Sequence, residues 1–321
     1  MIFSENRCTL FWIMRSSRKS ISKEMASPVS RRHSGVSRPS PHGPACVALI
    51  AVALSGCSIN LGSLTPSSTS EPEPARLTSQ SNIGSLSETV KNNPTDPQAY
   101  NMRGAVLAQA GKTEEALADF NKAISLDPNY GQAYANRGLI YRQTRRLDQA
   151  MADYERALSL DANYAPAYLG RGLVYKARNQ PAEALADFNK AIALAPDNTE
   201  AYYNRGLLYQ GQKQHQNAID DFTKANGLMP QQAEPLLGRA LSYLATDHTK
   251  EAAADLDEAV QDDPRNPQAW LTRGLAYERL GDKNKAAGSY GRAINLRPKD
   301  EVARTGFARV GGKPGQSYDT F

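Results

Sequence analysis

The sequence repeats itself every 34 residues from 97 to 300, without an insertion or a deletion. When Tyr100 is taken as position 4 of the repeat, a large residue recurs there six times, as Tyr100, Tyr134, Tyr168, Tyr202, Leu236 and Trp270. Position 8 is Gly or Ala in every copy, and positions 20 and 27 are always Ala. A fixed period of this length is typical of stacked supersecondary units. The chain is therefore predicted to form an extended array.

The spacing within one period predicts two helices. Positions 4, 8 and 11 lie on one face of a first helix (helix A), and positions 20, 24 and 27 on one face of a second (helix B). Small residues at 8 and 20 let the two helices approach closely. Pro at position 32 separates one hairpin from the next, because it lacks an N–H and clashes with a continuing helix. Ala162 replaces it in the second repeat, where a more helical or more mobile junction is expected.

These positions resemble the signature of the tetratricopeptide-repeat family. The resemblance implies an all-α, right-handed superhelical solenoid of six helical hairpins, at 97–130, 131–164, 165–198, 199–232, 233–266 and 267–300. Segments 85–96 and 301–310 are expected to cap the array, because a solenoid must cover its two ends. The expected domain is thus 85–310, preceded by a flexible Ser/Thr/Pro-rich tether at 58–84 and followed by a disordered tail at 311–321.

A second recurrence sets this array apart from the family consensus. Position 7 is Arg in all six repeats, and position 23 is Asp in five. The expected structural pairs are Arg103–Asp119, Arg137–Asp153, Arg171–Asp187, Arg205–Asp221 and Arg239–Asp255, each joining helix A to helix B. The alternative is a basic ladder that binds an anionic ligand. Arg273 has Ser289 in place of the acid, so it is the arginine expected to lack a partner.

Helix A lines the concave face in the family, and here its positions 5 and 9 carry an apolar stripe. The candidate groove residues are Leu139, Leu169, Leu173, Tyr203, Leu207, Leu237, Leu241, Leu271 and Leu275. An exposed apolar strip indicates an interaction surface. It predicts a groove for an apolar or amphipathic helix from a partner protein or from a second copy of the chain, as in a homodimer. The alternative is that tight curvature buries these side chains between neighbouring A helices.

Residues 1–57 have the features of a secretory signal. A basic stretch precedes ten apolar residues, Ala45–Leu54, a run too short to span a bilayer. The run ends Leu54-Ser55-Gly56-Cys57, which resembles the lipobox of bacterial lipoproteins. That resemblance implies lipidation at Cys57 and, because Ser58 follows, a periplasm-facing place at the outer membrane of a Gram-negative bacterium. The leader is long, and Met25 offers an alternative start.

Charge and composition narrow the function classes. The net charge of +5 belongs to the leader, because residues 58–321 carry 30 basic and 31 acidic side chains. A nucleic-acid partner, which needs a basic folded face, is therefore disfavoured. Residues 58–321 contain no cysteine, two separated histidines, and no phosphate loop or nucleophile–base motif. We expect no enzyme activity, no metal and no cofactor.

The expected function is a protein-interaction scaffold held in the bacterial envelope by its lipid, with no other membrane contact. Cell-wall, envelope or pilus assembly are the processes that the resemblance implies, and it does not choose among them. The alternatives are a cytoplasmic adaptor, if the leader is not a working signal, and a regulatory subunit of an enzyme complex.

Overall fold

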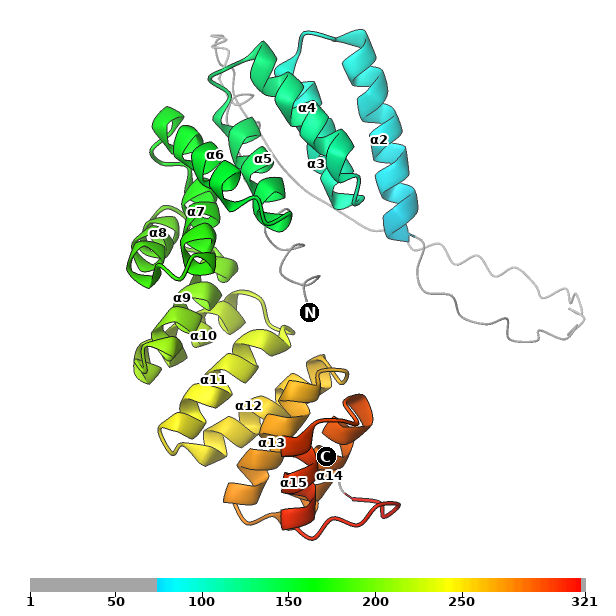
Figure 1. The fold of residues 1–321 in the computed structure, drawn as a ribbon, viewed down its shortest axis with the longest axis vertical. Helices are drawn as coiled ribbons and strands as arrows, with labels where there is room; N and C mark the ends of the chain where they lie inside the picture. Colours follow the sequence, from blue (N-terminus) through cyan, green and yellow to red (C-terminus); the bar gives the residue numbers. More distant parts are fainter. Residues whose placement is uncertain (1–73, 319–321) are drawn as a thin grey trace, which may run out of the picture.

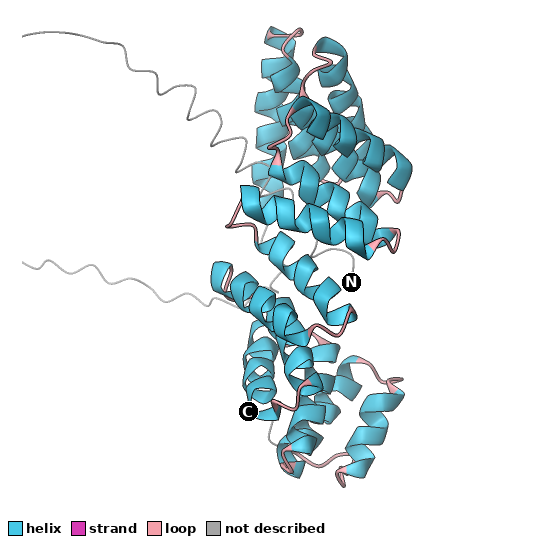
Figure 2. Ribbon diagram, turned by 90° about the vertical axis from the view of Figure 1, so that its left-hand side faces the viewer, coloured by secondary structure: helices cyan, strands magenta, loops and turns pink. Residues whose placement is uncertain are grey.

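The computed structural model describes residues 74–318, and every regular element in that range is an α-helix (Figures 1 and 2). The A helices are α3 (Pro97–Gln109), α5 (Gly131–Gln143), α7 (Ala165–Ala177), α9 (Thr199–Gly211), α11 (Ala233–Ala245) and α13 (Pro267–Arg279). The B helices are α4 (Thr113–Leu126), α6 (Leu147–Leu160), α8 (Pro181–Leu194), α10 (His215–Leu228), α12 (Thr249–Asp262) and α14 (Lys283–Leu296). The predicted all-α array of six hairpins is confirmed.

The hairpins stack in chain order into one curved solenoid, from α2 at one end to α15 at the other (Figure 1). Each A helix packs on its own B helix and on the helix before it, and most also pack on the next A helix, as α5 does with α6, α4 and α7. Each hairpin therefore contacts chiefly its neighbours, which is why the array has many short-range contacts and no single central core.

The core of each hairpin is an aromatic or leucine side chain from helix B at position 24. Phe222 is fully buried, and its ring lies between Gly206 of its own repeat and Gly238 of the next. A Cβ added to Gly206 or Gly238 would lie 2.9 or 2.7 Å from the ring. Glycine is required at these two positions because the ring occupies the space that any larger residue would need.

The turn between helices A and B needs a left-handed residue at position 15 in every repeat. Gly111 and Gly281 take this conformation in the first and last repeats, with φ of 77° and 81°. The remaining four residues are Arg145, Asn179, Lys213 and Asp247, with φ between 57° and 63°. Left-handed backbone strains a residue that has a Cβ, so these turns carry a small conformational cost.

The junction after the second repeat is regular, although Ala162 replaces proline there. Helix α6 ends at Leu160, at the same repeat position as the other B helices, so the expected extra helicity is wrong. Asp161 ends the helix instead, because its carboxylate accepts a hydrogen bond from the Asn163 N–H at 2.8 Å. Such an Asx turn competes with helix continuation.

The N-terminal capping helix is longer than expected. Helix α2 (Pro74–Asn92) starts within the segment assigned to the tether, so the tether assignment is wrong for 74–84. Ile83, Leu86 and Val90 recur at a helical period that composition alone concealed. Ile83 packs against the buried cluster of the first hairpin, and Val90 is 7% exposed. This contact with α3 and α4 gives the helix a reason to extend.

The C-terminal end also differs from expectation. Helix α15 (Glu301–Arg309) forms as predicted, capped by the Asp300 carboxylate, which accepts from the Ala303 N–H. The predicted disorder is wrong for residues 311–318, which fold back on α15. The Tyr318 and Phe307 rings lie edge to face with centroids 5.7 Å apart, and this aromatic contact holds the segment.

Candidate functional site

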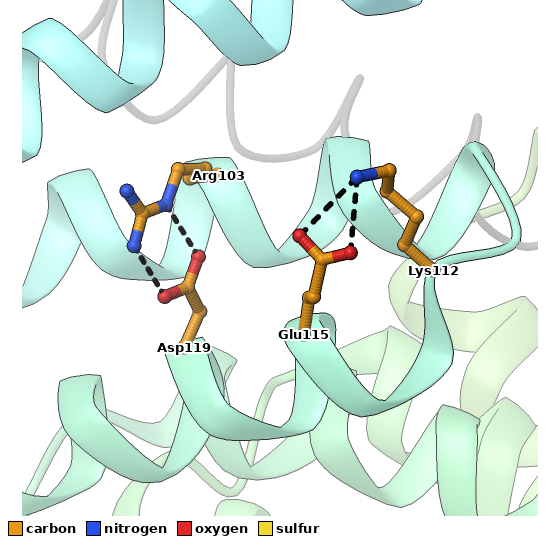
Figure 3. A network of polar contacts seen from close by, with 4 residues as sticks. All are labelled: Arg103, Lys112, Glu115 and Asp119. Atoms are coloured by element: carbon orange, nitrogen blue, oxygen red, sulfur yellow. Dashed lines mark hydrogen bonds and ion pairs between the residues drawn. The ribbon is translucent and has the colours of Figure 1, made fainter.

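The five predicted Arg–Asp pairs are all present, each with the same geometry. The arginine Nε donates to Oδ2 and Nη2 donates to Oδ1, at 2.7–2.8 Å in every repeat from the first to the fifth. Figure 3 shows the Arg103–Asp119 pair between α3 and α4, beside the exposed Lys112–Glu115 pair. The two parallel hydrogen bonds are the bidentate fit of guanidinium to carboxylate.

The electrostatics of these pairs favour the charged arginine. Hydrogen bonding to the paired aspartate raises the pKa of Arg103, Arg137, Arg171, Arg205 and Arg239. Burial raises the pKa of Asp153 and Asp221, and the arginine partner opposes this effect. Each of these guanidinium groups already donates two hydrogen bonds to its own aspartate. The arginines are therefore poorly placed to act as the alternative anion-binding ladder.

The arginines also connect one hairpin to the next, which sequence analysis missed. Arg137 Nη1 donates to Asn121 Oδ1 at 2.6 Å, and Arg205 Nη1 donates to Asn189 Oδ1 at the same distance. Both asparagines lie on the preceding B helix, at position 25. A single guanidinium therefore ties two successive B helices to one A helix. The sequence does contain a signal for these contacts, because each asparagine precedes its arginine by 16 residues, just as each paired aspartate follows its arginine by 16.

Arg273 is not without a partner. Its side chain is 1% exposed, and Nε donates to Oδ1 of Asp257 on the preceding B helix at 2.6 Å. Nη1 donates to Ser289 Oγ at 2.7 Å, and the Tyr277 hydroxyl donates to the other Asp257 oxygen at 2.7 Å. The expectation of a lone arginine is therefore wrong, because the acid sits at position 25 of the previous repeat rather than at position 23 of its own.

The expected apolar stripe is not continuous. Leu139, Leu169, Leu173 and Leu271 are buried, so these four are core residues and cannot line an open groove. Leu169 and Leu173, for example, belong to a buried cluster that includes Phe188 of their own repeat and Ala201 of the next. The accessible members are Tyr203, Leu207, Leu237, Leu241 and Leu275. Leu241 is the most open, at 37% exposed.

Family comparisons cover the same part of the chain. Models described as TPR or tetratricopeptide repeat match residues 97–130, 120–152, 138–179, 172–213, 199–232 and 237–301. The chain is a tetratricopeptide-repeat protein. A search of curated protein sequences finds no match.

Two solved structures illustrate the likeness of this tetratricopeptide array to others. PilF of Pseudomonas aeruginosa aligns with a TM-score of 0.62 and 22% identity, over 66% of this chain and 97% of PilF. PilW, a type IV pilus biogenesis factor, aligns with a TM-score of 0.58 and 21% identity, over 65% of this chain and 97% of PilW. At these identities the likeness establishes the shared fold.

Polar contacts on the tetratricopeptide A helices border the accessible apolar residues. Lys176 Nζ donates to Asn204 Oδ1 at 2.7 Å, across one repeat junction. Gln210 Nε2 donates to the Gly238 carbonyl and to Ser242 Oγ, both at 2.8 Å, across the next. These contacts link the residues at position 12 of one A helix to the middle of the following one. They join α7 to α9 and α9 to α11, and the last two of these helices carry accessible apolar residues.

Some predictions concern parts of the chain beyond residues 74–318. Cys57 and its lipobox lie there, as do the leader and residues 58–73. Within the described residues, no helix is long and apolar enough to cross a membrane. No group of three His, Cys, Asp or Glu side chains in that range is arranged to hold a metal ion.

Proposed function

We propose that this tetratricopeptide-repeat protein is a non-enzymatic scaffold that holds a partner protein against its A helices. The observation that carries the proposal is the cluster of large accessible side chains on three successive A helices, namely Tyr203, Leu207, Leu237, Leu241 and Leu275. We call this cluster the A-helix patch. It is smaller than the stripe expected from sequence, and it lies on α9, α11 and α13.

The chemistry of the A-helix patch suits an amphipathic helix. Apolar side chains from three successive A helices are at least partly accessible, and Lys176 and Gln210 make polar contacts on the same helices or next to them. A partner helix would bury its apolar side chains against the leucines and Tyr203, in the way that helix-in-groove complexes do. Tyrosine, as at position 203, is one of the residue types enriched at the energetic centre of such interfaces.

Substitution within the A-helix patch tests the proposal. Leu207→Glu combined with Leu241→Glu places two charges in the contact and should abolish capture of envelope partners after crosslinking, because desolvating an unpaired carboxylate is costly. Both side chains are accessible, so circular dichroism should show unchanged helicity. The matched control is Ala193→Glu with Gly227→Glu, which adds the same charges to exposed positions of α8 and α10. Capture of the same proteins by the patch variant would refute this binding site.

We further propose that Cys57 carries a lipid that places the scaffold at the outer membrane, facing the periplasm, where it serves cell-wall, envelope or pilus assembly. The support is the position of the Leu-Ser-Gly-Cys motif directly after the apolar run. A clickable palmitate analogue should label the wild-type chain in cells and should not label Cys57→Ala. Equal labelling of both chains would rule out lipidation at Cys57 and leave the scaffold proposal standing.

A further inference from the structure

Within residues 74–318, the last helix of the solenoid, α15, is not followed by a helix B. Helix α15 occupies the place of a seventh helix A, since Gly306 at position 6 lies against the Tyr290 ring of α14 as Gly238 lies against the Phe222 ring of α10. In each of the six complete repeats, a helix B follows helix A and packs on it. Here the chain turns at Gly311 and Gly315, both at positive φ, and only the short segment 312–318 returns over α15.

A pocket of about 530 Å³ lies between α14, α15 and this returning segment. Helix α14 contributes three small residues, Ala287, Gly288 and Gly291, together with the larger Arg292, Ile294 and Asn295. The rings of Phe307 and Tyr318 also line the pocket. The Tyr318 hydroxyl also accepts a hydrogen bond from the Lys313 N–H at 2.6 Å, so the returning segment has a defined conformation. The volume falls within the range of pockets that bind small ligands or an inserted side chain.

Three cationic side chains, Arg292, Arg304 and Lys313, line the same pocket. Among residues 74–318, Arg304 pairs with Glu301 at 3.3 Å, but both side chains are more than half exposed, and such pairs are weak. Neither Arg292 nor Lys313 has a carboxylate partner in that part of the chain. The pocket therefore concentrates positive charge around an apolar interior.

The surrounding sequence reinforces this charge. From 283 to 318 the basic residues are Lys283, Lys285, Arg292, Arg297, Lys299, Arg304, Arg309 and Lys313, and the acidic residues are Asp300 and Glu301. Nearly all of the excess lies on α14, α15 and the returning segment. The near-neutral total for residues 58–321 conceals this basic end, which is balanced chiefly by residues 233–266, where eight acidic side chains outnumber three basic ones. Such a field attracts anionic partners and raises their association rate.

We propose that this pocket is a second docking site, separate from the A-helix patch, which binds an acidic peptide segment of a partner protein. One apolar side chain of the peptide packs against the rings of Phe307 and Tyr318 in the pocket, and flanking carboxylates pair with Arg292 and Lys313. Charge complementarity selects the acidic residues, because guanidinium binds carboxylate in a bidentate manner. The aromatic and glycine walls select the apolar residue, which a simple inorganic anion does not supply.

A defined peptide tests the site on the full chain, held in a non-ionic detergent. The peptide Asp-Glu-Phe-Glu-Asp, with blocked ends, should bind saturably in isothermal titration calorimetry and should bind less tightly as salt rises. The neutral peptide Asn-Gln-Phe-Gln-Asn and the peptide with Ala in place of Phe should each bind at least about tenfold less tightly. Together the two analogues separate the contribution of charge from that of apolar insertion.

Two variants of the chain separate the same contributions. Arg292→Gln with Lys313→Gln removes charge, and Gly291→Leu fills the cavity while keeping every charge. Each should weaken binding at least about tenfold. The matched control is Lys190→Gln with Lys224→Gln, which removes two exposed charges from B helices at the repeat position of Arg292. The control should bind like the wild type.

The proposal fails if the peptide shows no saturable binding up to about 1 mM. It also fails if either pocket variant binds like the wild type, or if the Ala peptide binds as well as the Phe peptide. Tighter binding to a short DNA duplex, or to phosphatidylglycerol vesicles, than to the peptide would identify a different class of ligand and overturn it. None of these outcomes affects the A-helix patch, which lies on other helices.

Discussion

The Arg273 guanidinium pairs with Asp257 of the preceding repeat, with Nε and Oδ1 2.6 Å apart. In the first five repeats the corresponding arginine pairs with an aspartate of its own repeat, such as Arg239 with Asp255 at 2.7 Å. The direction of the ion pair therefore reverses at the last hairpin. Because Arg273 is 1% exposed, it depends on Asp257 and Ser289 for its hydrogen bonds.

Asp257→Asn should lower the free energy of unfolding by about 1–3 kcal/mol, since a buried arginine loses its charged partner. Urea denaturation followed by circular dichroism measures this effect. Asp262→Asn, at an exposed position near the end of the same helix, should have little effect. Adding Ser289→Asp to Asp257→Asn restores the arrangement of the other repeats and should recover stability. An Asp257→Asn variant as stable as the wild type would contradict the assigned dependence.

Gly238→Ala should destabilise the protein by about 1–3 kcal/mol, because the added methyl group would overlap the buried Phe222 ring. Gly227→Ala on α10 is the matched control, since no atom lies within 4 Å of its added Cβ. In an exposed helix this second change should stabilise by about 0.5–1 kcal/mol. Thermal unfolding of the two variants should therefore shift in opposite directions, and shifts of the same sign would argue against the packing described.

Lys213→Gly should stabilise the protein by about 0.5–1 kcal/mol, because Lys213 adopts a φ of 60° that glycine tolerates without strain. The same substitution in a helix, Lys190→Gly on α8, should destabilise by about 0.5–1 kcal/mol. Urea midpoints provide the comparison. A loss of stability in Lys213→Gly would show that unfolded-state entropy outweighs the backbone strain.

The C-terminal capping helix should respond to acid. Hydrogen bonds from Arg309 and from the Tyr290 hydroxyl lower the pKa of Glu278 below its ordinary value of 4.5. A lowered folded-state pKa means that this carboxylate stabilises the protein above pH 4.5, and that the stabilisation is lost as pH falls through the folded-state pKa.

Glu278→Gln should therefore unfold at a lower temperature than the wild type at pH 6. The difference between the two should shrink as the pH falls below 4.5. Thermal melts between pH 3 and 7 measure it, with Glu301→Gln on α15 as a control, because its arginine contact is exposed. A difference that stays constant with pH would mean that Glu278 acts without its charge.

Local spacing accounts for how much could be predicted from sequence alone. The 34-residue period placed all six hairpins, and a 16-residue separation placed Arg103 beside Asp119 and its four counterparts. These predictions succeeded because each contact lies within one hairpin, where helix geometry fixes which side chains meet. The same reasoning placed Phe307 on the inner face of α15.

Tertiary structure decided what depends on the relation between hairpins. Leu139 and Leu241 both occupy position 9 of their repeats, yet Leu139 is buried and Leu241 is 37% exposed. Packing of α13 on the preceding helix α12 also brought Asp257 to Arg273, and an aromatic contact brought Tyr318 back to Phe307. The local repeat therefore determined which helix and which position each residue occupies. Its exposure was determined by how successive hairpins pack on one another, which the pattern of a single repeat does not contain.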